Sequence, residues 1–487
     1  MNKLEQYFEK YRENTIGYNQ EYTSPYGKQK IIYADWVASG RLYKPIEDKM
    51  ANNFGPFVAN THTETSEVGT LMTNSYHYAK QIIKNHVNAN ENDVLINTGF
   101  GMTSAINKLQ RIIGLKYCGR KQHANCVSEN DKPVVFVTHM EHHSNHTSWL
   151  TTIADVVLIE PDSNLLISLE NLETELKKYK DRSIKIGAFT AASNVTGITP
   201  PYHKMAKLMH QYNGLCFVDF AMAAPYINID MHPANPEEEL DAITFSPHKF
   251  LGGPGSAGVL IFNKELYKRE TPDNPGGGTV DWTNAWGEFK FVDDIELRED
   301  GGTPGFLQTI RTALSINLKN EMGVENMQNR EQELLEIVFE EFSKIEGINI
   351  LALNEKHRLG AVSFYHNKIH FNLLVKLLSD RYGIQVRGGC ACAGTYGHYL
   401  LNVDYNKSQS ITKKINKGDL SEKPGWVRLS IHPMMKNDEI YYISKSLNEI
   451  VENINTFIKD YEYVPNTNEF VFKKDYKKLD YKQWFNF

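Results

Sequence analysis

Two residues that lie thirty positions apart offer complementary chemistry. Lys249, in the run Ser246-Pro247-His248-Lys249, carries an amine that can form an imine with a carbonyl carbon. Asp219 ends a short apolar run, and its carboxylate can hold a heteroaromatic nitrogen in the protonated form. An enzyme that uses pyridoxal 5'-phosphate (PLP) needs both groups, a lysine that holds the cofactor and a carboxylate at its ring nitrogen. The pair therefore favours a PLP enzyme.

Composition excludes several classes of protein. The chain has 487 residues and 41% hydrophobic content, enough for a large core and two or three domains. A formal net charge of −6 argues against nucleic acid as a partner. The polar N-terminus and the absence of a long apolar run argue against a signal peptide and against a membrane partner. Because five scattered cysteines do not form a disulfide scaffold, we expect a cytoplasmic protein.

Short β-branched runs alternate with helix-length segments through the first half of the chain. The expected strands cover residues 94–96, 134–137, 156–159, 186–190, 215–218, 242–245 and 258–262. The expected helices between them cover residues 103–116, 169–179 and 202–212. This alternation predicts an α/β fold with a mainly parallel, seven-stranded sheet between helices. The polar runs follow the strands, so they should gather at the carboxyl edge of that sheet, where ligands bind in such folds.

A Gly/Pro-rich stretch from Pro275 to Gly305 marks a domain transition. We therefore expect a large cofactor-binding domain over residues 31–305 and a smaller α+β domain over residues 306–487, which carries Cys390 and Cys392. Residues 1–30 have apolar positions at helical spacing and should pack on the smaller domain. One long or broken helix is expected over residues 307–342.

The order and spacing of the motifs resemble the class V aminotransferase family of fold-type I PLP enzymes, and specifically its cysteine desulfurase and selenocysteine lyase branch. The resemblance covers about Ile31 to Met434. The matching motifs are Tyr33-Ala34-Asp35, Glu141-His142-His143-Ser144-Asn145, Ser193-Asn194-Val195-Thr196-Gly197, Asp219, Ser246-Pro247-His248-Lys249, Gly276-Gly277-Gly278 and Gly302-Thr303-Pro304. The resemblance implies the fold-type I transferase architecture, PLP as cofactor and a homodimer.

The resemblance assigns roles to the residues that would hold the cofactor ring. Lys249 matches the lysine that forms the Schiff base, and Asp219 matches the residue that pairs with the pyridinium. His142, favoured over the adjacent His143, matches the imidazole that stacks on the ring and can relay protons. A zinc site in this histidine cluster lacks a supporting cysteine or carboxylate pattern, so no metal is expected.

Other matches concern the phosphate of the cofactor. Met102 and Thr103 begin a predicted helix, where free backbone amides and the helix dipole attract an anion. Ser246 and His248 resemble the other phosphate donors of the family. Thr279 resembles a residue that reaches the phosphate of the neighbouring subunit, which implies active sites at a dimer interface.

The phenolate oxygen of the cofactor should receive one hydrogen bond from Asn194. The family usually has a glutamine as a second donor three residues after the aspartate, but this chain has Met222. A thioether cannot donate a hydrogen bond. The sequence therefore leaves the pKa of the imine undetermined, whereas cofactor binding is not affected by the change.

Two cysteines lie in a glycine-flanked run that begins after Val386. In the selenocysteine-lyase-like desulfurases an arginine precedes the nucleophilic cysteine by five residues, and Arg387 and Cys392 keep that spacing. Such a cysteine needs an exposed loop and a lowered pKa. Cys390-Ala391 stands where the family commonly has two histidines, so Cys390 could share the nucleophile role, form a disulfide with Cys392, or simply pack. Residues 395–424 resemble an insertion close to the site.

The expected reaction combines these residues with Arg428, which resembles the arginine that clamps the substrate carboxylate, assisted by Arg387. The resemblance implies removal of sulfur from L-cysteine, or of selenium from selenocysteine, through an enzyme persulfide that gives alanine. The catalytic residues would be Lys249, Cys392 and His142, and a sulfur-acceptor protein is a possible partner. The alternatives are a PLP-dependent lyase, epimerase or aminotransferase that acts on another amino acid without a persulfide, and a non-catalytic binding module.

Overall fold

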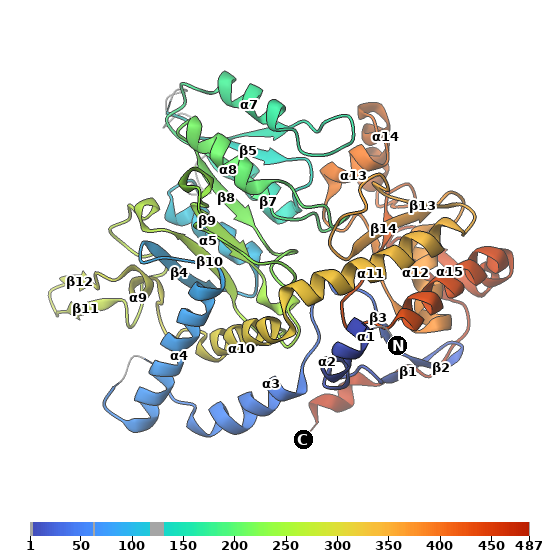
Figure 1. The fold of residues 1–487 in the computed structure, drawn as a ribbon, viewed down its shortest axis with the longest axis horizontal. Helices are drawn as coiled ribbons and strands as arrows, with labels where there is room; N and C mark the ends of the chain where they lie inside the picture. Colours follow the sequence, from blue (N-terminus) through green and yellow to red (C-terminus); the bar gives the residue numbers. More distant parts are fainter. Residues whose placement is uncertain (1–2, 62–63, 117–130, 487) are drawn as a thin grey trace. The chain divides into compact units, whose positions relative to one another are not determined.

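The computed structural model describes residues 3–61, 64–116 and 131–486 and divides the chain into two compact units (Figure 1). The large unit comprises Ser39–Ser193 and Thr199–Val324. The small unit comprises Met1–Ala38, Asn194–Ile198 and Glu325–Phe487. The sequence suggested boundaries after residues 30 and 305, whereas the corresponding boundaries of the two units lie after Ala38 and Val324. Of the five cysteines, Cys118 and Cys126 lie outside the described residues.

The large unit is built on one seven-stranded sheet, in which only β10 runs against its neighbours. The strand order is β4-β10-β9-β8-β7-β5-β6. The strands are β4 (Asp93–Thr98), β5 (Val134–Thr138), β6 (Asp155–Ile159), β7 (Lys185–Thr190), β8 (Leu215–Asp219), β9 (Ala242–Phe245) and β10 (Gly258–Asn263). The prediction of a mainly parallel α/β sheet is confirmed. Continuous apolar runs fit this sheet because helices cover both of its faces.

Alternating residues of β7 show how the two faces are covered. Ile186 and Ala188 belong to the same apolar core as the buried residues of α5 (Met102–Ile112). A Cβ at Gly187 would point to the other face, toward the side chain of Met209 in α8 (Tyr202–Gln211). Because successive strand residues face opposite sides of a sheet, α5 and α8 cover opposite faces. Helix α7 (Leu169–Lys178) packs beside α8.

Helices α4 (Glu67–His86) and α10 (Phe306–Met322) pack together in the large unit (Figure 1). Helix α10 stops at Gly323, which has a φ of 74°. Glycine reaches this left-handed conformation without a steric penalty, so the expected long helix is broken here and continues as α11 (Val324–Ser343). The other elements of the large unit are α3 (Lys44–Lys49), α6 (His143–His146), β11 (Val280–Thr283), β12 (Phe289–Phe291) and α9 (Ile295–Glu299).

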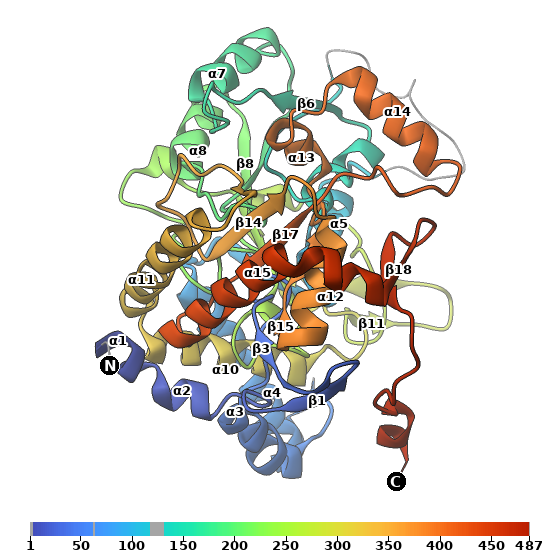
Figure 2. The ribbon, with the colours of Figure 1, turned by 90° about the vertical axis from the view of Figure 1, so that its right-hand side faces the viewer.

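The small unit contains an antiparallel sheet with the strand order β13-β14-β17-β16. Its strands are β13 (Ile348–Ile350), β14 (Ala361–His366), β17 (Trp426–Ser430) and β16 (Arg387–Gly389). Helices α12 (Phe371–Tyr382) and α15 (Asn437–Phe457) run side by side in this unit (Figure 2). Residues 395–424, which the sequence suggested as an insertion, contain most of α13 (Gly394–Leu400) and all of α14 (Tyr405–Ile415).

The N-terminal segment belongs to the small unit. It contains α1 (Lys3–Tyr7) and α2 (Glu9–Glu13), and the buried Arg12 donates through Nε to the backbone oxygen of Met434 at 2.6 Å. Three strand pairs complete the unit, namely β1 (Glu21–Ser24) with β2 (Gly27–Lys30), β3 (Ile32–Tyr33) with β15 (Ile384–Gln385), and β18 (Tyr461–Val464) with β19 (Glu469–Phe472). Across the part of the chain that the structure describes, no helix is both long and apolar enough to cross a membrane.

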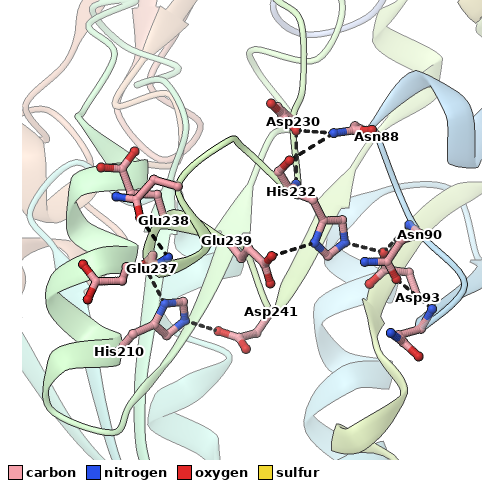
Figure 3. A network of polar contacts seen from close by, with 12 residues as sticks. Asn88, Asn90, Asp93, His210, Asp230, His232, Glu237, Glu238, Glu239 and Asp241 are labelled. Atoms are coloured by element: carbon pink, nitrogen blue, oxygen red, sulfur yellow. Dashed lines mark hydrogen bonds and ion pairs between the residues drawn. The ribbon is translucent and has the colours of Figure 1, made fainter.

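Histidine–carboxylate pairs hold the edge of the large sheet at which the parallel strands begin (Figure 3). Nε2 of His210, at the end of α8, lies 2.9 Å from Oδ2 of Asp241, and the same oxygen accepts from the backbone N–H of Cys216 at 2.7 Å. His232 makes a similar contact with Asp93 at 2.6 Å. The hydrogen bond to Asp241 stabilises the charged imidazole and raises the pKa of His210 above its usual value.

We predict that His210→Gln destabilises the protein mainly at low pH. A histidine whose pKa is raised by folding stabilises the fold below its unfolded pKa, and this contribution disappears as the pH rises through the folded pKa. The loss in free energy of unfolding should be about 0.5–1 kcal/mol below pH ~6 and should shrink toward alkaline pH. Urea denaturation at several pH values measures it. His203→Gln, on the same helix, is the control, and an effect of His210→Gln that grows with pH would contradict the prediction.

Candidate active site

Asp219 and Lys249 lie in the same unit and within electrostatic reach of each other. Asp219 is the last residue of β8 and is buried, and its Oδ1 accepts from the backbone N–H of Ala221 at 2.8 Å. Lys249 is half-buried in the turn that follows β9. Burial raises the pKa of Asp219 to about 6, while the Ala221 N–H and the charge of Lys249 act in the opposite direction. The carboxylate therefore remains mainly ionised at neutral pH.

Three of the residues predicted to bind phosphate meet at the start of α5. The backbone N–H of Met102 donates to Oγ of Ser246 at 2.8 Å. Gly101 leaves room here, because a Cβ at this position would come within 2.8 Å of Oγ of Ser246 and 3.6 Å of Cδ2 of His248. Burial and the charge of Lys249 lower the pKa of His248 to about 4, so its imidazole is neutral. These groups form a small, uncharged, donor-rich cradle at a helix N-terminus.

The remaining predicted phosphate residues have other contacts. The hydroxyl of Thr103 lies 2.7 Å from the hydroxyl of Ser144, at the exposed side of α5. Thr279 is buried, and its hydroxyl donates to the backbone oxygen of Gly276 at 2.6 Å. The hydroxyl of Thr279 is thus used in a hydrogen bond within the turn from Gly276 to Thr279. The role of Thr279 at the phosphate of a neighbouring subunit stays a prediction.

His142 lies directly before α6, with its side chain fixed by the start of that helix. Its Nδ1 accepts from the backbone N–H of Ser144 at 3.1 Å. A neutral imidazole that accepts through Nδ1 carries its proton on Nε2. His142 therefore presents an N–H at the outer end of its ring, as a proton relay requires, and its role in stacking stays a prediction.

Glu141 is a residue of this motif to which the sequence gave no role. Its buried carboxyl group accepts hydrogen bonds from the hydroxyl of Thr138 (2.7 Å), the side-chain amide of Asn145 (2.7 Å) and the backbone N–H of Thr190 (2.9 Å). Burial raises the pKa of Glu141 to about 8, the three hydrogen bonds lower it, and the nearby Asp219 raises it further. Glu141 thereby joins the ends of β5 and β7 to α6. Its position next to His142 was the signal available in the sequence.

The two predicted substrate-binding arginines meet on one carboxylate in the small unit. Arg428 in β17 is almost fully buried, and its Nη2 donates to Oδ1 of Asp35 at 2.7 Å. Nε of Arg387 donates to Oδ2 of the same Asp35 at 3.1 Å, and the two arginines face each other across β16 and β17. Burial lowers the pKa of Arg428, and Asp35 opposes that shift. The sequence pointed to Asp35 through its motif but not to this bridging role.

The predicted cysteine loop is a tight turn in the same unit. It follows β16, and Cys392 is exposed whereas Cys390 is half-buried. The side-chain Nδ2 of Asn194 donates to the backbone oxygen of Ala391, between the two cysteines, at 2.6 Å. Nη1 of Arg428 donates a second hydrogen bond, to the backbone oxygen of Asn194 at 3.1 Å. Asn194 therefore links the arginine cluster to the cysteine loop.

A model of the aminotransferase class-V family matches residues 32–443 of the chain. The chain belongs to this family. Among its relatives, a protein of Staphylococcus aureus strain Mu50 named "Probable cysteine desulfurase" is 28% identical over 401 residues, which are 80% of this chain and 91% of that protein. A protein of Halalkalibacterium halodurans with the same name is 27% identical over 367 residues, 74% of this chain and 84% of that protein.

The fold of this class-V family member also occurs in a solved structure described as the apo structure of cysteine desulfurase from Thermococcus onnurineus NA1. The two structures have a TM-score of 0.73 at 20% sequence identity, over 91% of this chain and 98% of the other. Together with the seven-stranded sheet, this likeness confirms the fold-type I architecture expected from the sequence.

We predict that Asp35→Asn destabilises this class-V protein much more than Arg387→Gln does. The first change leaves the buried Arg428 without its carboxylate and should lower the free energy of unfolding by about 3 kcal/mol. The second removes an ion pair whose arginine is 48% exposed, and should cost about 1 kcal/mol or less. Urea denaturation at neutral pH compares them. Equal losses would show that Asp35 does not act chiefly on Arg428.

Proposed function

We propose that this class-V aminotransferase family member is a PLP-dependent cysteine desulfurase. The observation that carries the proposal is the exposed Cys392, held in a tight turn five residues after Arg387 and on the same unit as the buried Arg428. A thiol that attacks a substrate must be accessible, and an arginine that receives an α-carboxylate must be held in place. Relatives named as cysteine desulfurases support the same reading.

The residues of the large unit fit PLP. The hydroxyl of Ser246 accepts from Met102 and keeps its own proton to donate to a phosphate oxygen, and Gly101 leaves space beside it. Asp219 is buried yet mainly ionised, which suits a partner that carries a proton on a ring nitrogen. When bound at Lys249, the cofactor supplies a ring that withdraws electrons from the substrate and so weakens the bonds at its Cα.

Each proposed catalytic residue has a separate task. The amine of Lys249 holds the cofactor and, once released, moves a proton at the substrate Cα. His142, with its proton on Nε2, stacks on the ring. The side-chain amide of Asn194 donates one hydrogen to the backbone oxygen of Ala391, and its second hydrogen is the one we assign to the phenolate oxygen. Met222 is buried and offers no donor, so Asn194 carries that contact without the second donor usual in the family.

The remaining proposed roles concern the substrate. Arg428 and Arg387, held by Asp35, bind the α-carboxylate of cysteine. The thiolate of Cys392 attacks the substrate sulfur, so the Cβ–S bond breaks, an S–S bond forms, and the electron pair left on Cβ is protonated. The products are alanine and a persulfide on Cys392. Selenocysteine fits the same scheme, because selenium takes the place of sulfur in each step.

We also propose a cytoplasmic homodimer that passes sulfur to an acceptor protein. The likeness of Thr279 to a residue that reaches across a dimer interface supports the homodimer. The exposure of Cys392 supports an acceptor, because a partner thiol needs access to the persulfide.

We predict that the PLP-loaded protein converts L-cysteine into alanine and sulfide, and that Cys392→Ala lowers alanine formation by about a hundredfold or more, as removal of an attacking nucleophile does. Amino-acid analysis and a sulfide assay measure the two products. Cys216→Ala, which removes a buried thiol in β8, is the matched control and should retain activity. Pyruvate and ammonia as products, or activity untouched by Cys392→Ala, would instead favour the lyase, epimerase or aminotransferase alternative.

A further inference from the structure

Residues 390–393, which we call the cysteine turn, place two thiols on a constrained backbone. The backbone N–H of Ala393 donates to the carbonyl of Cys390 at 3.0 Å, which closes a four-residue turn. Its two central residues, Ala391 and Cys392, have φ values of 49° and 56°. Positive φ at both central positions is the pattern of a type I′ turn, which normally favours glycine or asparagine. This chain therefore holds alanine and cysteine in a conformation that such residues rarely adopt.

Contacts on both sides keep the cysteine turn in this conformation. The amide of Asn194 donates to the carbonyl of Ala391 at 2.6 Å, in the middle of the turn. Helix α13 begins directly after it, and the backbone N–H of Gly397 in that helix donates to the carbonyl of Ala393, the last residue of the turn, at 2.9 Å. Conformations of this kind persist where the surroundings determine them, and they concentrate at functional sites.

From the turn type we infer a Cα separation of the two cysteines that suits a disulfide. In a helical conformation of either hand, Cα atoms two residues apart are separated by about 5.4 Å. Disulfide-bonded cysteines have Cα atoms 4.4–6.8 Å apart and most often about 5.5–6 Å apart. Both cysteines are free thiols, and Cys392 is exposed whereas Cys390 is half-buried. A sulfur group on Cys392 therefore has a second thiol within the same short turn.

We propose that Cys390 is a resolving cysteine, which releases sulfide from the persulfide on Cys392. This inference rests on the proposed desulfurase function. The thiolate of Cys390 attacks Sγ of Cys392, the bond between Sγ and the terminal sulfur breaks, and the terminal sulfur leaves as hydrosulfide with the electron pair of that bond. The product is a Cys390–Cys392 disulfide. A cellular dithiol, or two monothiols, then reduces this disulfide and is itself oxidised to a disulfide.

This step defines what the enzyme delivers. With each turnover, cysteine and two thiol equivalents give alanine, hydrosulfide and an oxidised thiol. Sulfide is then the product in the presence of a reductant, while an acceptor protein would compete with Cys390 for the persulfide. With one equivalent of L-cysteine per active site and no other thiol, the reaction stops after one turnover, with the cysteine turn oxidised.

Single-turnover product analysis tests the proposal. The PLP-loaded protein receives one equivalent of L-cysteine per active site and no other thiol, and alanine, free sulfide and the mass of the tryptic peptide 388–407 are measured. This peptide contains Cys390 and Cys392 and no other cysteine. We predict about one sulfide per alanine and a peptide lighter by two hydrogens, as the proposed stoichiometry requires. In Cys390→Ser the sulfide-to-alanine ratio should fall at least tenfold, with the peptide heavier by one sulfur atom.

The outcomes separate the two proposals. Alanine without free sulfide in the wild-type protein, with the extra sulfur retained on the peptide, would overturn the resolving role and leave the desulfurase function intact. An absence of alanine from the wild-type protein would overturn the desulfurase function.

A second measurement does not require turnover. The protein is treated with one equivalent of glutathione disulfide, and the same peptide is analysed. Formation of the Cys390–Cys392 disulfide with release of glutathione supports the pairing of the two thiols. A stable glutathione adduct on Cys392 would contradict it, whatever the reaction of the enzyme.

Discussion

The buried carboxylate of Asp219 is the constraint on which the large unit depends. An ionised group in an apolar interior is costly unless a positive charge and hydrogen bonds accompany it. Here the N–H of Ala221 and the charge of Lys249 oppose the effect of burial, and the pKa of Asp219 is raised only to about 6. The carboxyl edge of the sheet is thereby prepared for a cationic ligand, and the neutral, donor-rich cradle around Ser246 suits the anionic end of the same ligand.

Glu141 shows how a different environment gives a neighbouring carboxyl group the opposite role. It is as deeply buried as Asp219, but its partners are three neutral donors rather than a lysine. Burial raises the pKa of Glu141 to about 8, so it is mainly protonated at neutral pH and serves as a structural link between strands. Environments that separate the pKa values of two nearby acids also separate their functions. The same logic applies in the small unit, where Asp35 keeps the buried Arg428 charged and oriented.

Much of this organisation could be predicted from the sequence. All seven strands of the large sheet were expected within two residues of their ends, because buried parallel strands are short, β-branched and followed by polar turns. The positions of Asp219 and Lys249 after strands placed them at the carboxyl edge. Helix α5 is shorter than expected, because it ends at Ile112 and Gly114 adopts a positive φ.

Other features depend on contacts that no local pattern reveals. Asp35 and Arg428 are 393 residues apart, and Asn194 and Ala391 are 197 residues apart, so only the folded chain pairs them. The positive φ of Ala391 could not be predicted either, because glycine is the residue usually expected at a position with positive φ. The unit boundary lies after α10 rather than at the Gly/Pro-rich stretch, because α10 packs against α4.

The identity of the lysine that binds PLP is the most direct test of the proposed cofactor site. The protein is loaded with PLP, reduced with borohydride to make the link permanent, digested and analysed by mass spectrometry. We expect the phosphopyridoxyl group on Lys249, and a much lower yield of it in Asp219→Asn, because the charge that retains the ring is lost. No stable label, or a label on another lysine such as the buried Lys319, would show that Lys249 is not the residue that holds PLP.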